Sequence, residues 1–521
     1  MIRPTLEEAQ KLAPGYTILP LSLEIFSDMT TPIEMLRTMR QHSECWYILE
    51  SVNSADSWGR YTFLGYQPVM TVFKENGSLM VRSKDQGTVK KSDAAAGVSP
   101  LTALRDMIAH YKSPLLSYLP PFTGGFVGYF AYESARDFIP GLKLNAGGTE
   151  DSRDFHLMLM DKVIAFDHFK QKIYLMANIP AEDLENSYAR GVAELEDMAQ
   201  VLLAPFSPPE QNRSILPMGS HGAHGAYGSH GSHGAYGSHD PFTASFSEDT
   251  FKDRVEKIKG HITEGDIFQA VLSNRFQAAF QGDLLDTYRI LRTTNPSPYM
   301  VYMRLEDTEI ACSSPETLVS VHNAQVHSFP LAGSRPRGVT AQEDKALIED
   351  LLQDEKELAE HDMLVDLARN DIGKVCRFGS VQLQEYRQVK RFSHISHIAS
   401  HVTGDLDTGQ DALDVLAATL PAGTLSGAPK KRACEIIDDV EGLRRGIYGG
   451  GIGYIDFAGN MDMCIGIRMA VLKNNTVSVQ TGAGIVDDSV PEKEYQETLT
   501  KARPVMEALK NSGGLTYDTH Y

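Results

Sequence analysis

The chain has 521 residues, of which 49 are Lys or Arg and 68 are Asp or Glu, so its formal net charge is −19. This negative charge repels phosphate backbones, and because no local basic stripe offsets it, a nucleic-acid-binding protein is excluded. Hydrophobic residues make up 42% and charged residues 22%, a composition typical of a folded globular protein and not of a disordered chain. At roughly 150 residues per domain, the length predicts two or three domains.

No segment is typical of export or of a membrane anchor. Residues 1–16 contain acids where a signal peptide needs an apolar core, and no apolar run approaches the roughly 20 residues that span a bilayer. The five cysteines stand singly, without a CxxC pair, so neither a disulfide framework nor a zinc–thiolate site is expected. We therefore expect a cytoplasmic protein with no membrane partner.

The first 240 residues predict a β-rich part followed by a linker. Between 45 and 179, short segments rich in β-branched and aromatic residues alternate with Gly and Pro, which indicates antiparallel sheet, and a helical pattern covers 182–203. Residues 219–239 contain HGAYGSH twice and bury too little apolar surface to fold, although their histidines could bind Ni²⁺ or Zn²⁺ adventitiously. The expected parts are an N-terminal β-rich domain (1–212), a flexible linker (213–243) and a second domain (244–521).

The sequence of the second domain predicts a mixture of helices and strands. Ser247 caps a helix whose apolar face ends at Gly265, and residues 267–276 alternate like a strand. Further helices are expected at 341–371, 411–418 and 489–510, and further strands at 299–304, 309–312, 447–455, 462–472 and 476–480. The whole pattern is that of an α+β fold.

Two of these helices each carry a pair of glutamates three residues apart, Glu357 with Glu360 and Glu494 with Glu497. At this spacing both side chains of a pair lie on one face of the helix. If folding brings the two faces together, they offer several oxygen ligands and no sulfur, which suits Mg²⁺. The alternative is that each pair lies on an ordinary solvated helix face.

The strand expected at 462–472 places Arg468 on one face with small residues as its neighbours. The open volume around such an arginine could hold a ligand carboxylate, although an arginine paired with a protein acid at a sheet edge is the alternative. The Gly-rich segments 421–430, 448–454 and 480–486 allow backbone N–H groups to approach a small anion. None of them matches a dinucleotide fingerprint or a P-loop.

Taken together, these motifs resemble the chorismate-utilising enzymes, and most closely the large subunits of anthranilate synthase. The matching segments follow the order of that family between about 250 and 505, and ILES and GRYTFLGY extend the resemblance into the N-terminal half. They are GDIFQAVLSNRF, SSPETLV, LAGSRPRG, ELAEHDMLVDLARNDIG, SHISHIASHVTG, PAGTLSGAPKKRA, YGGGIGYIDFAGNMDMCIGIRMAV, QTGAGIV and EKEYQETLTKA. The resemblance implies antiparallel sheets packed face to face and flanked by helices.

Single residues separate the reactions of this family. Enzymes that form para-aminobenzoate resemble a PIKGT motif whose lysine bonds to the ring, and this chain has Ala332 there. Isochorismate and salicylate synthases carry a lysine that activates water where this chain has Gln269. The resemblance therefore implies that ammonia is the nucleophile and anthranilate the product. The alternatives are a para-aminobenzoate synthase component and a non-catalytic tryptophan-binding relative.

The resemblance also implies a metal site and a substrate site. The expected Mg²⁺ ligands are Glu360 and Glu497, with Glu357 and Glu494 beside them. The residues expected to contact chorismate are Tyr448, Arg468, Gly482, Ala483, Gly484, Ser334 and Gly427.

The residues expected to act in the reaction are Glu316, His397, Thr424 and Lys501. Glu316 is expected to protonate the departing hydroxyl group, so we predict a buried site that raises its pKa. His397 is expected to act when pyruvate is eliminated, and Lys501 to lie near the metal-bound acid.

The source of ammonia lies outside this chain. None of the five cysteines lies in a nucleophile elbow, and residue 2 is Ile, so no N-terminal cysteine is available to attack glutamine. The enzyme therefore uses free ammonia or a separate glutamine amidotransferase subunit. We expect a heterotetramer of two large and two small subunits.

A second, regulatory site is implied by segments that resemble the tryptophan-binding segments of the family. A carboxylate for the ligand ammonium, hydroxyl and backbone donors for its carboxylate and an apolar slot for indole make physical sense together. The expected residues are Glu50, Ser51, Arg60, Pro298, Tyr299, Met300 and Cys464. The alternative is that these segments only pack the two halves together, and in either case the halves are interleaved.

Overall fold

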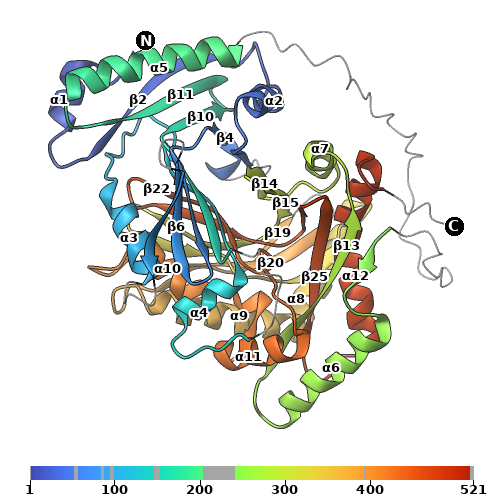
Figure 1. Ribbon diagram of the computed structural model, residues 1–521. Helices are drawn as coiled ribbons and strands as arrows, with labels where there is room; N and C mark the ends of the chain where they lie inside the picture. The colour runs from blue at the N-terminus through green and yellow to red at the C-terminus, as the bar shows by residue number, and fades with distance from the viewer. Residues whose placement is uncertain are drawn as a thin grey trace.

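The computed structural model describes residues 2–51, 57–83, 87–93, 99–145, 153–203, 241–391 and 395–516. They form two large antiparallel sheets with helices on their outer faces (Figure 1). The Gly/Ser/His repeat at 219–239 lies outside the described residues. The division of the chain at 213–243 therefore stays a prediction.

The first sheet takes strands from both halves of the chain. In spatial order its strands are β1 (Ile2–Arg3), β2 (Ile18–Phe26), β11 (Lys172–Pro180), β10 (Lys162–Asp167), β4 (Tyr61–Tyr66), β3 (Trp46–Glu50), β14 (Tyr299–Leu305), β15 (Thr308–Ser314), β24 (Met469–Lys473), β25 (Thr476–Ile485), β13 (Gln269–Ala279) and β12 (Thr243–Ala244), with β21 (Gly427–Ala428) also paired to β13. Met300 of β14 pairs with Glu50 of β3. This pairing confirms that the two halves are interleaved.

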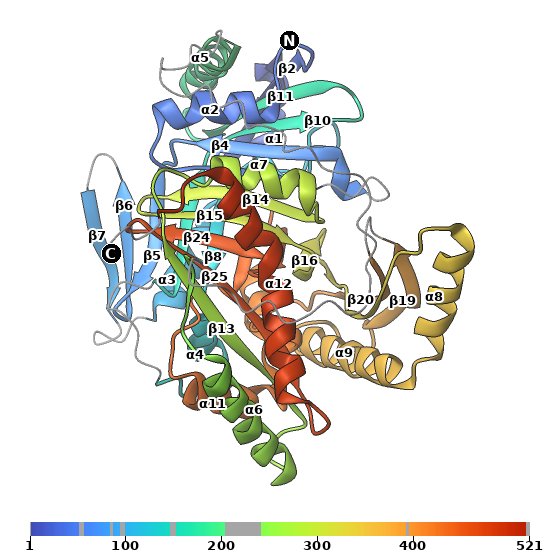
Figure 2. The same cartoon turned by 90° about the vertical axis from the view of Figure 1, so that its right-hand side faces the viewer.

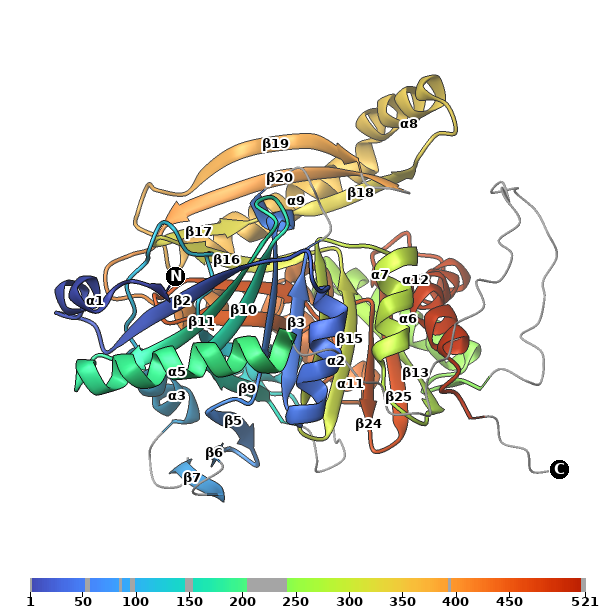
Figure 3. The ribbon, with the colours of Figure 1, turned by 90° about the horizontal axis from the view of Figure 1, so that it is seen from above.

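The second sheet also crosses between the halves. In spatial order its strands are β18 (Leu331–Pro336), β20 (Ile395–Asp405), β17 (Gln325–Ser328), β16 (Thr317–His322), β23 (Met461–Ile465), β22 (Gly451–Asp456), β8 (Gly125–Phe130), β9 (Phe155–Met160), β5 (Met70–Glu75), β6 (Ser78–Ser83) and β7 (Gly87–Asp93), with β19 (Gln382–Arg391) also paired to β20. Gly451 of β22 pairs with Phe130 of β8. Figure 3 shows β19 at the outer edge of the molecule.

The two sheets pack face to face, as expected. One hydrophobic core contains Phe63 and Val301 from the first sheet together with Phe126 and Met463 from the second. Phe122 lies between the sheets, with ring centroids 5.6 Å from Phe63 and 4.2 Å from Tyr454. Each fully buried side chain of this kind contributes roughly 1.5–3 kcal/mol, so the shared core joins the halves tightly.

Helices cover the outer faces of the sheets (Figure 1). They are α1 (Leu6–Leu12), α2 (Pro32–His42), α3 (Pro100–His110), α4 (Ala135–Phe138), α5 (Leu184–Leu203), α6 (Glu248–Thr263), α7 (Leu285–Thr294), α8 (Ala341–Gln353), α9 (Glu355–Gly373), α10 (Ala412–Thr419), α11 (Lys430–Glu441) and α12 (Pro491–Ser512). A second core under α2, α5, α7 and α12 contains Met39, Leu195, Tyr288 and Val505. None of the described helices is long and apolar enough to cross a membrane.

The helix expected at 341–371 is divided in two. The break falls at Asp354, whose extended backbone ends α8 and whose carboxylate accepts hydrogen bonds from the N–H groups of Lys356 and Glu357. A side-chain acceptor at this position satisfies N–H groups that have no partner within the helix. Asp354 therefore sets the start of α9, the helix that carries Glu357 and Glu360.

The prediction of a single strand at 462–472 is wrong, because this segment forms parts of two strands, β23 and β24. The chain leaves the second sheet at Ile465, at the end of β23, and enters the first sheet at Met469 with β24. Arg468 lies in this crossing with a left-handed backbone (φ 51°), and a Cβ on Gly466 would lie 2.3 Å from the carbonyl oxygen of Ile447. The small residue at 466 therefore allows a close backbone crossing and does not line a strand face beside Arg468.

Candidate active site

The two glutamate pairs approach each other from α9 and α12. Figure 2 shows α9 next to the lower part of α12, and the Lys356 ammonium lies 3.9 Å from Asp488 in the turn before α12. Burial raises the pKa of Glu360, and the charges of Glu357 and Glu497 raise it further. The acidic faces of the two helices are therefore within electrostatic reach of each other.

Three cations lie near these carboxylates, and one of them, Lys356, acts on both Glu360 and Glu494. The Lys501 Nζ is 2.7 Å from Glu497 Oε1 and donates to the carbonyl oxygen of Gly482 at 3.0 Å. The Arg335 guanidinium lies 3.6 Å from Glu357 Oε1. The sequence analysis did not identify Arg335 as a site residue, although it lies next to Ser334 in the matching segment LAGSRPRG. The four carboxylates thus carry more negative charge than the neighbouring cations carry positive charge.

The donor set of the four glutamates fits a divalent cation. Burial raises the pKa of Glu494 as well, and the Glu497 charge adds to that effect. Their ligand atoms do not converge within 4.8 Å, since the one described group of three or more His, Cys, Asp or Glu that does so is His261, Glu264 and Asp266. In that group Asp266 already pairs with the Arg432 guanidinium at 2.8 Å. The oxygen-only set on α9 and α12 is the better match to Mg²⁺.

Glu316 has the environment predicted for a proton donor. Its carboxyl group accepts a hydrogen bond from the Thr424 hydroxyl at 2.8 Å. Burial raises the pKa of Glu316 to about 7, against the smaller opposing effects of the Thr424 hydrogen bond and the Lys501 charge. Glu316 and Thr424 line a cavity of about 50 Å³ that is otherwise largely apolar, with Leu364 and Leu367 of α9 among its walls.

Tyr448 and Arg468 lie near the Gly-rich strand β25. Tyr448 is 3% exposed, and a Cβ on Gly482 would lie 2.8 Å from its hydroxyl oxygen. Burial lowers the pKa of Arg468, and the nearby Tyr448 and Glu497 oppose that effect. The structure therefore brings Arg468, Tyr448 and Gly482 together beside the acidic face of α12.

Close packing explains why two other glycines expected to contact chorismate, Gly427 and Gly484, have no side chain. A Cβ on Gly427 would lie 2.0 Å from the carbonyl oxygen of Gln269, and one on Gly484 would lie 2.9 Å from the Gln269 side-chain nitrogen. Ala483, which precedes Gly484 in β25, is fully buried in a third core. A role for these three residues in binding chorismate stays a prediction, since close strand packing alone explains the small side chains.

His397 and Ser334 are directly opposite each other on β20 and β18. The His397 Nδ1 lies 3.2 Å from the carbonyl oxygen of Gly333. Burial lowers the pKa of His397, the hydrogen bond to Gly333 opposes this effect, and the Arg468 charge adds to it, so that the pKa is lowered. The imidazole is therefore neutral near pH 7, the form that can accept a proton.

In the expected regulatory site, Glu50 already has several partners. Its carboxylate accepts from Tyr288 at 2.5 Å, from Arg292 at 2.9 Å and from Thr62 at 3.3 Å. The Ser51 hydroxyl is buried and finds no hydrogen-bond partner among the described residues. Arg292 was missed by the sequence analysis, and its pairing with Glu50 spans the two halves of the chain.

The other expected regulatory residues fall into separate groups. Met300 is fully buried in the strand beside Glu50, and Pro298 is half-buried just before it. Tyr299 donates to Asp462 at 3.0 Å. Cys464 lies within hydrogen-bonding range of Cys312, whereas Arg60 binds Asp167 through two hydrogen bonds of 2.9 and 2.6 Å. Arg60 and Cys464 therefore have unrelated partners.

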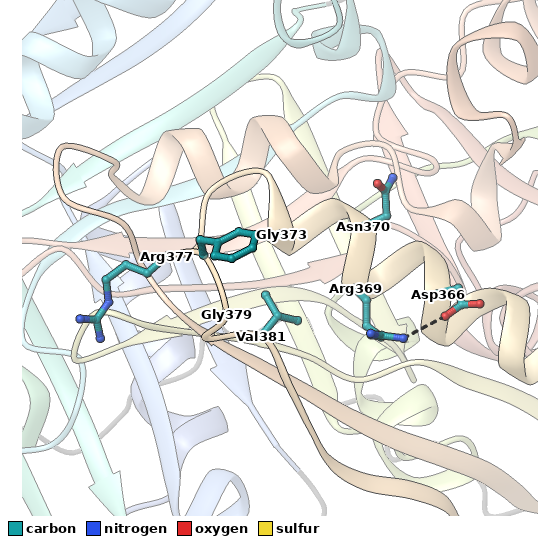
Figure 4. Close-up of a pocket in the computed structure, with 8 residues that line it drawn as sticks. Asp366, Arg369, Asn370, Gly373, Arg377, Gly379 and Val381 are labelled. Carbon is teal, nitrogen blue, oxygen red and sulfur yellow. Dashed lines mark hydrogen bonds and ion pairs between the residues drawn. The ribbon is translucent and has the colours of Figure 1, made fainter.

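A larger pocket of about 460 Å³ lies at the C-terminal end of α9 (Figure 4), and Glu316 is not among the residues that line it. Its walls include Phe378 and Val381, and an exposed ion pair of 3.3 Å joins Asp366 to Arg369 at its edge. It contains none of the residues that the sequence analysis singled out for chemistry. The cavity beside Glu316 is the better candidate for the reaction.

Comparisons with known proteins identify the family of this chain. The family model described as chorismate binding enzyme matches residues 61–507. Anthranilate synthase component 1 of Acetivibrio thermocellus is 38% identical over 98% of this chain and 99% of its own, and that of Aquifex aeolicus is 40% identical over 97% of each. The chain belongs to the anthranilate synthase component 1 family.

Solved structures show the same fold for this family. Anthranilate synthase component I from Streptococcus pneumoniae superposes with a TM-score of 0.71 at 36% identity, over 92% of this chain and 99% of that one. The menaquinone-specific isochorismate synthase of Escherichia coli has a TM-score of 0.65 at 18% identity, over 97% and 98%. The second likeness shows that the α+β arrangement of two sheets is shared beyond this family.

Proposed function

We propose that the chain is the large subunit of an anthranilate synthase, which converts chorismate and ammonia into anthranilate, pyruvate and water. The observation that carries this proposal is the partly buried Glu316, whose pKa is raised to about 7, in electrostatic contact with Lys501 beside the acidic faces of α9 and α12. Family membership supports the same activity.

Chorismate carries two carboxylates, and the site offers two places for them. Arg468 and Tyr448, with the backbone of Gly482–Gly484, bind the enolpyruvyl carboxylate. Burial strengthens an arginine–carboxylate hydrogen bond because little water competes for it. The ring carboxylate then faces the glutamates of α9 and α12.

Mg²⁺ is the cofactor that these glutamates would hold, with Glu360 and Glu497 as ligands and Glu357 and Glu494 beside them. When bound, the ion neutralises the ring carboxylate and stabilises negative charge that develops there. Lys501 sets the position of Glu497 through its 2.7 Å ion pair, and its second bond to Gly482 ties this acid to the substrate strand.

The proton transfers fall to Glu316 and His397. Glu316 donates its proton to the 4-hydroxyl group, which leaves as water while ammonia adds at C2 to give aminodeoxyisochorismate. The Thr424 hydroxyl holds the Glu316 carboxyl group in place at 2.8 Å. The neutral His397 then accepts the C2 proton as pyruvate is eliminated and the ring becomes aromatic.

A separate glutaminase subunit is proposed as the source of ammonia, in a complex of two large and two small chains. All five cysteines are free and buried. Burial raises the pKa of Cys45 and of Cys376 to about 11, so these thiols are poor nucleophiles near pH 7. The name component 1, which the relatives carry, supports a second component. Free thiols also suit the reducing cytoplasm.

The proposed activity can be tested with the purified chain, chorismate, Mg²⁺ and ¹⁵N-labelled ammonium. We expect fluorescent anthranilate with the label on the carbon next to the carboxylate-bearing carbon. Label at the ring position para to the carboxylate would indicate a para-aminobenzoate synthase component instead. Absence of any turnover, with tryptophan binding retained, would indicate a non-catalytic relative.

Feedback inhibition by tryptophan is proposed at the junction of β3 and β14, where the N-terminal part (1–212) provides Glu50 and Ser51 and the C-terminal part provides Met300. The buried Ser51 hydroxyl has no hydrogen-bond partner among the described residues and could donate to a ligand carboxylate. For inhibition, tryptophan must prefer a conformation with a poorer catalytic site.

Ser51→Phe is therefore expected to raise the tryptophan concentration that halves activity by roughly 10-fold or more, because the new ring removes the donor and fills its place. The rate without tryptophan is expected to stay within about twofold of wild type. Measuring anthranilate formation against tryptophan concentration decides this. Inhibition equal to that of the wild type would remove Ser51 from the site.

A further inference from the structure

Arg445 is a buried cation whose hydrogen bonds reach three parts of the molecule. It lies between α11 and β22 and is 3% exposed. Its guanidinium donates to both oxygens of Glu441 at 2.9 and 2.6 Å, to the carbonyl oxygen of Leu425 at 2.6 Å and to the carbonyl oxygen of Val271 at 2.6 Å. A fork of this kind fixes several acceptors in one plane.

The two carbonyl groups belong to elements that carry proposed site residues. Leu425 follows Thr424, whose hydroxyl binds Glu316. Val271 of β13 is directly opposite Gly484 of β25. The Tyr448 ring lies on a third side, with its centroid 5.6 Å from the guanidinium carbon. One side chain therefore contacts the turn that carries Thr424, the strand β13 that pairs with the substrate strand β25, and the proposed substrate tyrosine.

The surroundings hold Arg445 charged and fixed. Burial alone would lower the pKa of the guanidinium, and the adjacent Glu441 carboxylate reverses this, so that the pKa is raised. Glu441 is itself held by the backbone N–H of Ser273 at 2.7 Å. The backbone N–H of Arg445 donates to Glu133 at 2.7 Å, a residue of the N-terminal half. The position is therefore fixed from both ends of the side chain.

We propose that Arg445 is a positioning residue for the proposed anthranilate synthase reaction, one that holds the 423–425 turn, β13 and Tyr448 in register around chorismate. The inference rests on the proposed function. With Leu425 held, the Thr424 hydroxyl stays on Glu316. With Val271 held, β13 keeps its register against Gly484. A lysine places its donors on one nitrogen, so it cannot reach Glu441 and both carbonyl oxygens together.

Arg445→Lys is expected to fold and to lower kcat by roughly 10- to 100-fold, the range that small misplacements of reacting groups produce. Because the Thr424 hydrogen bond lowers the pKa of Glu316, a loosened turn is expected to move the alkaline limb of the kcat profile to higher pH. Arg444→Lys is the matched control. Among the described residues, its side chain binds Asp154 at 2.7 Å and no proposed site residue, so kcat and the alkaline limb are expected to stay unchanged.

A second variant covers the case in which Arg445→Lys does not fold. The double variant Arg445→Met, Glu441→Gln removes both charges together and keeps an acceptor for Ser273, so neither charge is left buried alone. The same fall in kcat and the same shift of the alkaline limb are expected. Wild-type kcat and an unmoved limb in either folded variant would overturn the proposal, and so would failure of both variants to fold, which would make Arg445 purely structural. A wild-type chain that forms no anthranilate would instead contradict the proposed function.

Discussion

Glu497→Gln is expected to lower kcat/KM for chorismate by roughly 100-fold or more and to raise the Mg²⁺ concentration that gives half-maximal activity. Glutamine keeps the shape of the side chain and removes its charge. Glu497 is the acid whose charge acts on both Glu360 and Glu494, so its loss weakens the shared field of the two helices. Initial rates measured over a Mg²⁺ titration give both quantities.

Unfolding cannot account for such a loss. The Glu497–Lys501 pair is 46% and 37% exposed, and pairs of this kind contribute about 0.2–1 kcal/mol, against roughly 5–15 kcal/mol for a whole fold. Glu492→Gln is the matched control on α12, because Glu492 is exposed and its carboxylate lies 3.8 Å from the Lys252 ammonium, away from the other glutamate pair. That variant is expected to behave as wild type. If Glu497→Gln also keeps the wild-type rate and Mg²⁺ requirement, the metal assignment is wrong.

The glutamate pairs could be predicted from sequence because helix geometry is local. A spacing of three places Glu357 with Glu360 on one face whatever surrounds them. That α9 and α12 face each other depends on the whole fold, and here the resemblance to a family supplied what spacing could not. The same holds for Glu316, whose burial comes from α9 and the turn at Thr424, far from it in the chain.

The crossing at Arg468 shows the limit of periodicity. Alternation of side chains has the same period in either sheet, so 462–472 looks like one strand. The pairing of β23 with β16 and of β24 with β15 decides that the chain changes sheet, and these pairings are long-range. The role expected for Arg468 stays a prediction, since the small residue at 466 serves the backbone crossing and does not line a strand face beside the arginine.

Arg445 and Arg292 were missed for a different reason. Glu441 and Arg445 have the spacing of an ordinary solvated i,i+4 pair, and nothing in the sequence distinguishes a buried pair from an exposed one. Arg292 binds Glu50, 242 residues away. The acceptors that reveal these contacts, Val271 for the buried Arg445 and Glu50 for the partly exposed Arg292, lie in distant parts of the chain.

Glu316→Gln is expected to lower kcat by roughly 10²- to 10⁴-fold, because glutamine has no acidic proton to give to the leaving hydroxyl group. In the wild type, the donor must be protonated, so kcat is full below pH 7 and is lost as pH rises through about 7. The residual activity of the variant is expected to lack this limb. Thr424→Val is expected to move the limb to higher pH, since the Thr424 hydrogen bond lowers the pKa of Glu316.

Because burial disfavours the charged carboxylate of Glu316, the Glu316→Gln variant is expected to be more stable than wild type at alkaline pH, although it is less active. The folded-state pKa of about 7 exceeds the ordinary value of 4.5, so the contribution of Glu316 to stability is fully present below pH 4.5 and is lost as pH rises through about 7. The difference of 2.5 corresponds to roughly 3 kcal/mol. Glutamine stays neutral, so denaturant unfolding at pH 8 is expected to show a more stable variant, with little difference at pH 4.5.

The Glu309→Gln variant is a control that separates the effect of burial on stability from the effect of proton donation on kcat. Glu309 is also buried, burial raises its pKa, and it accepts hydrogen bonds from Tyr302 and Leu284 in the core beneath α7. A carboxamide oxygen can accept the same two bonds, so this variant is expected to gain stability at pH 8 and to keep the wild-type kcat and its alkaline limb. A Glu316→Gln variant that is less stable than wild type at pH 8 would mean that the carboxylate is charged and satisfied in the folded state. In that case Glu316 could not be the proton donor, since a carboxylate that is stable as an anion near neutral pH has no proton to transfer.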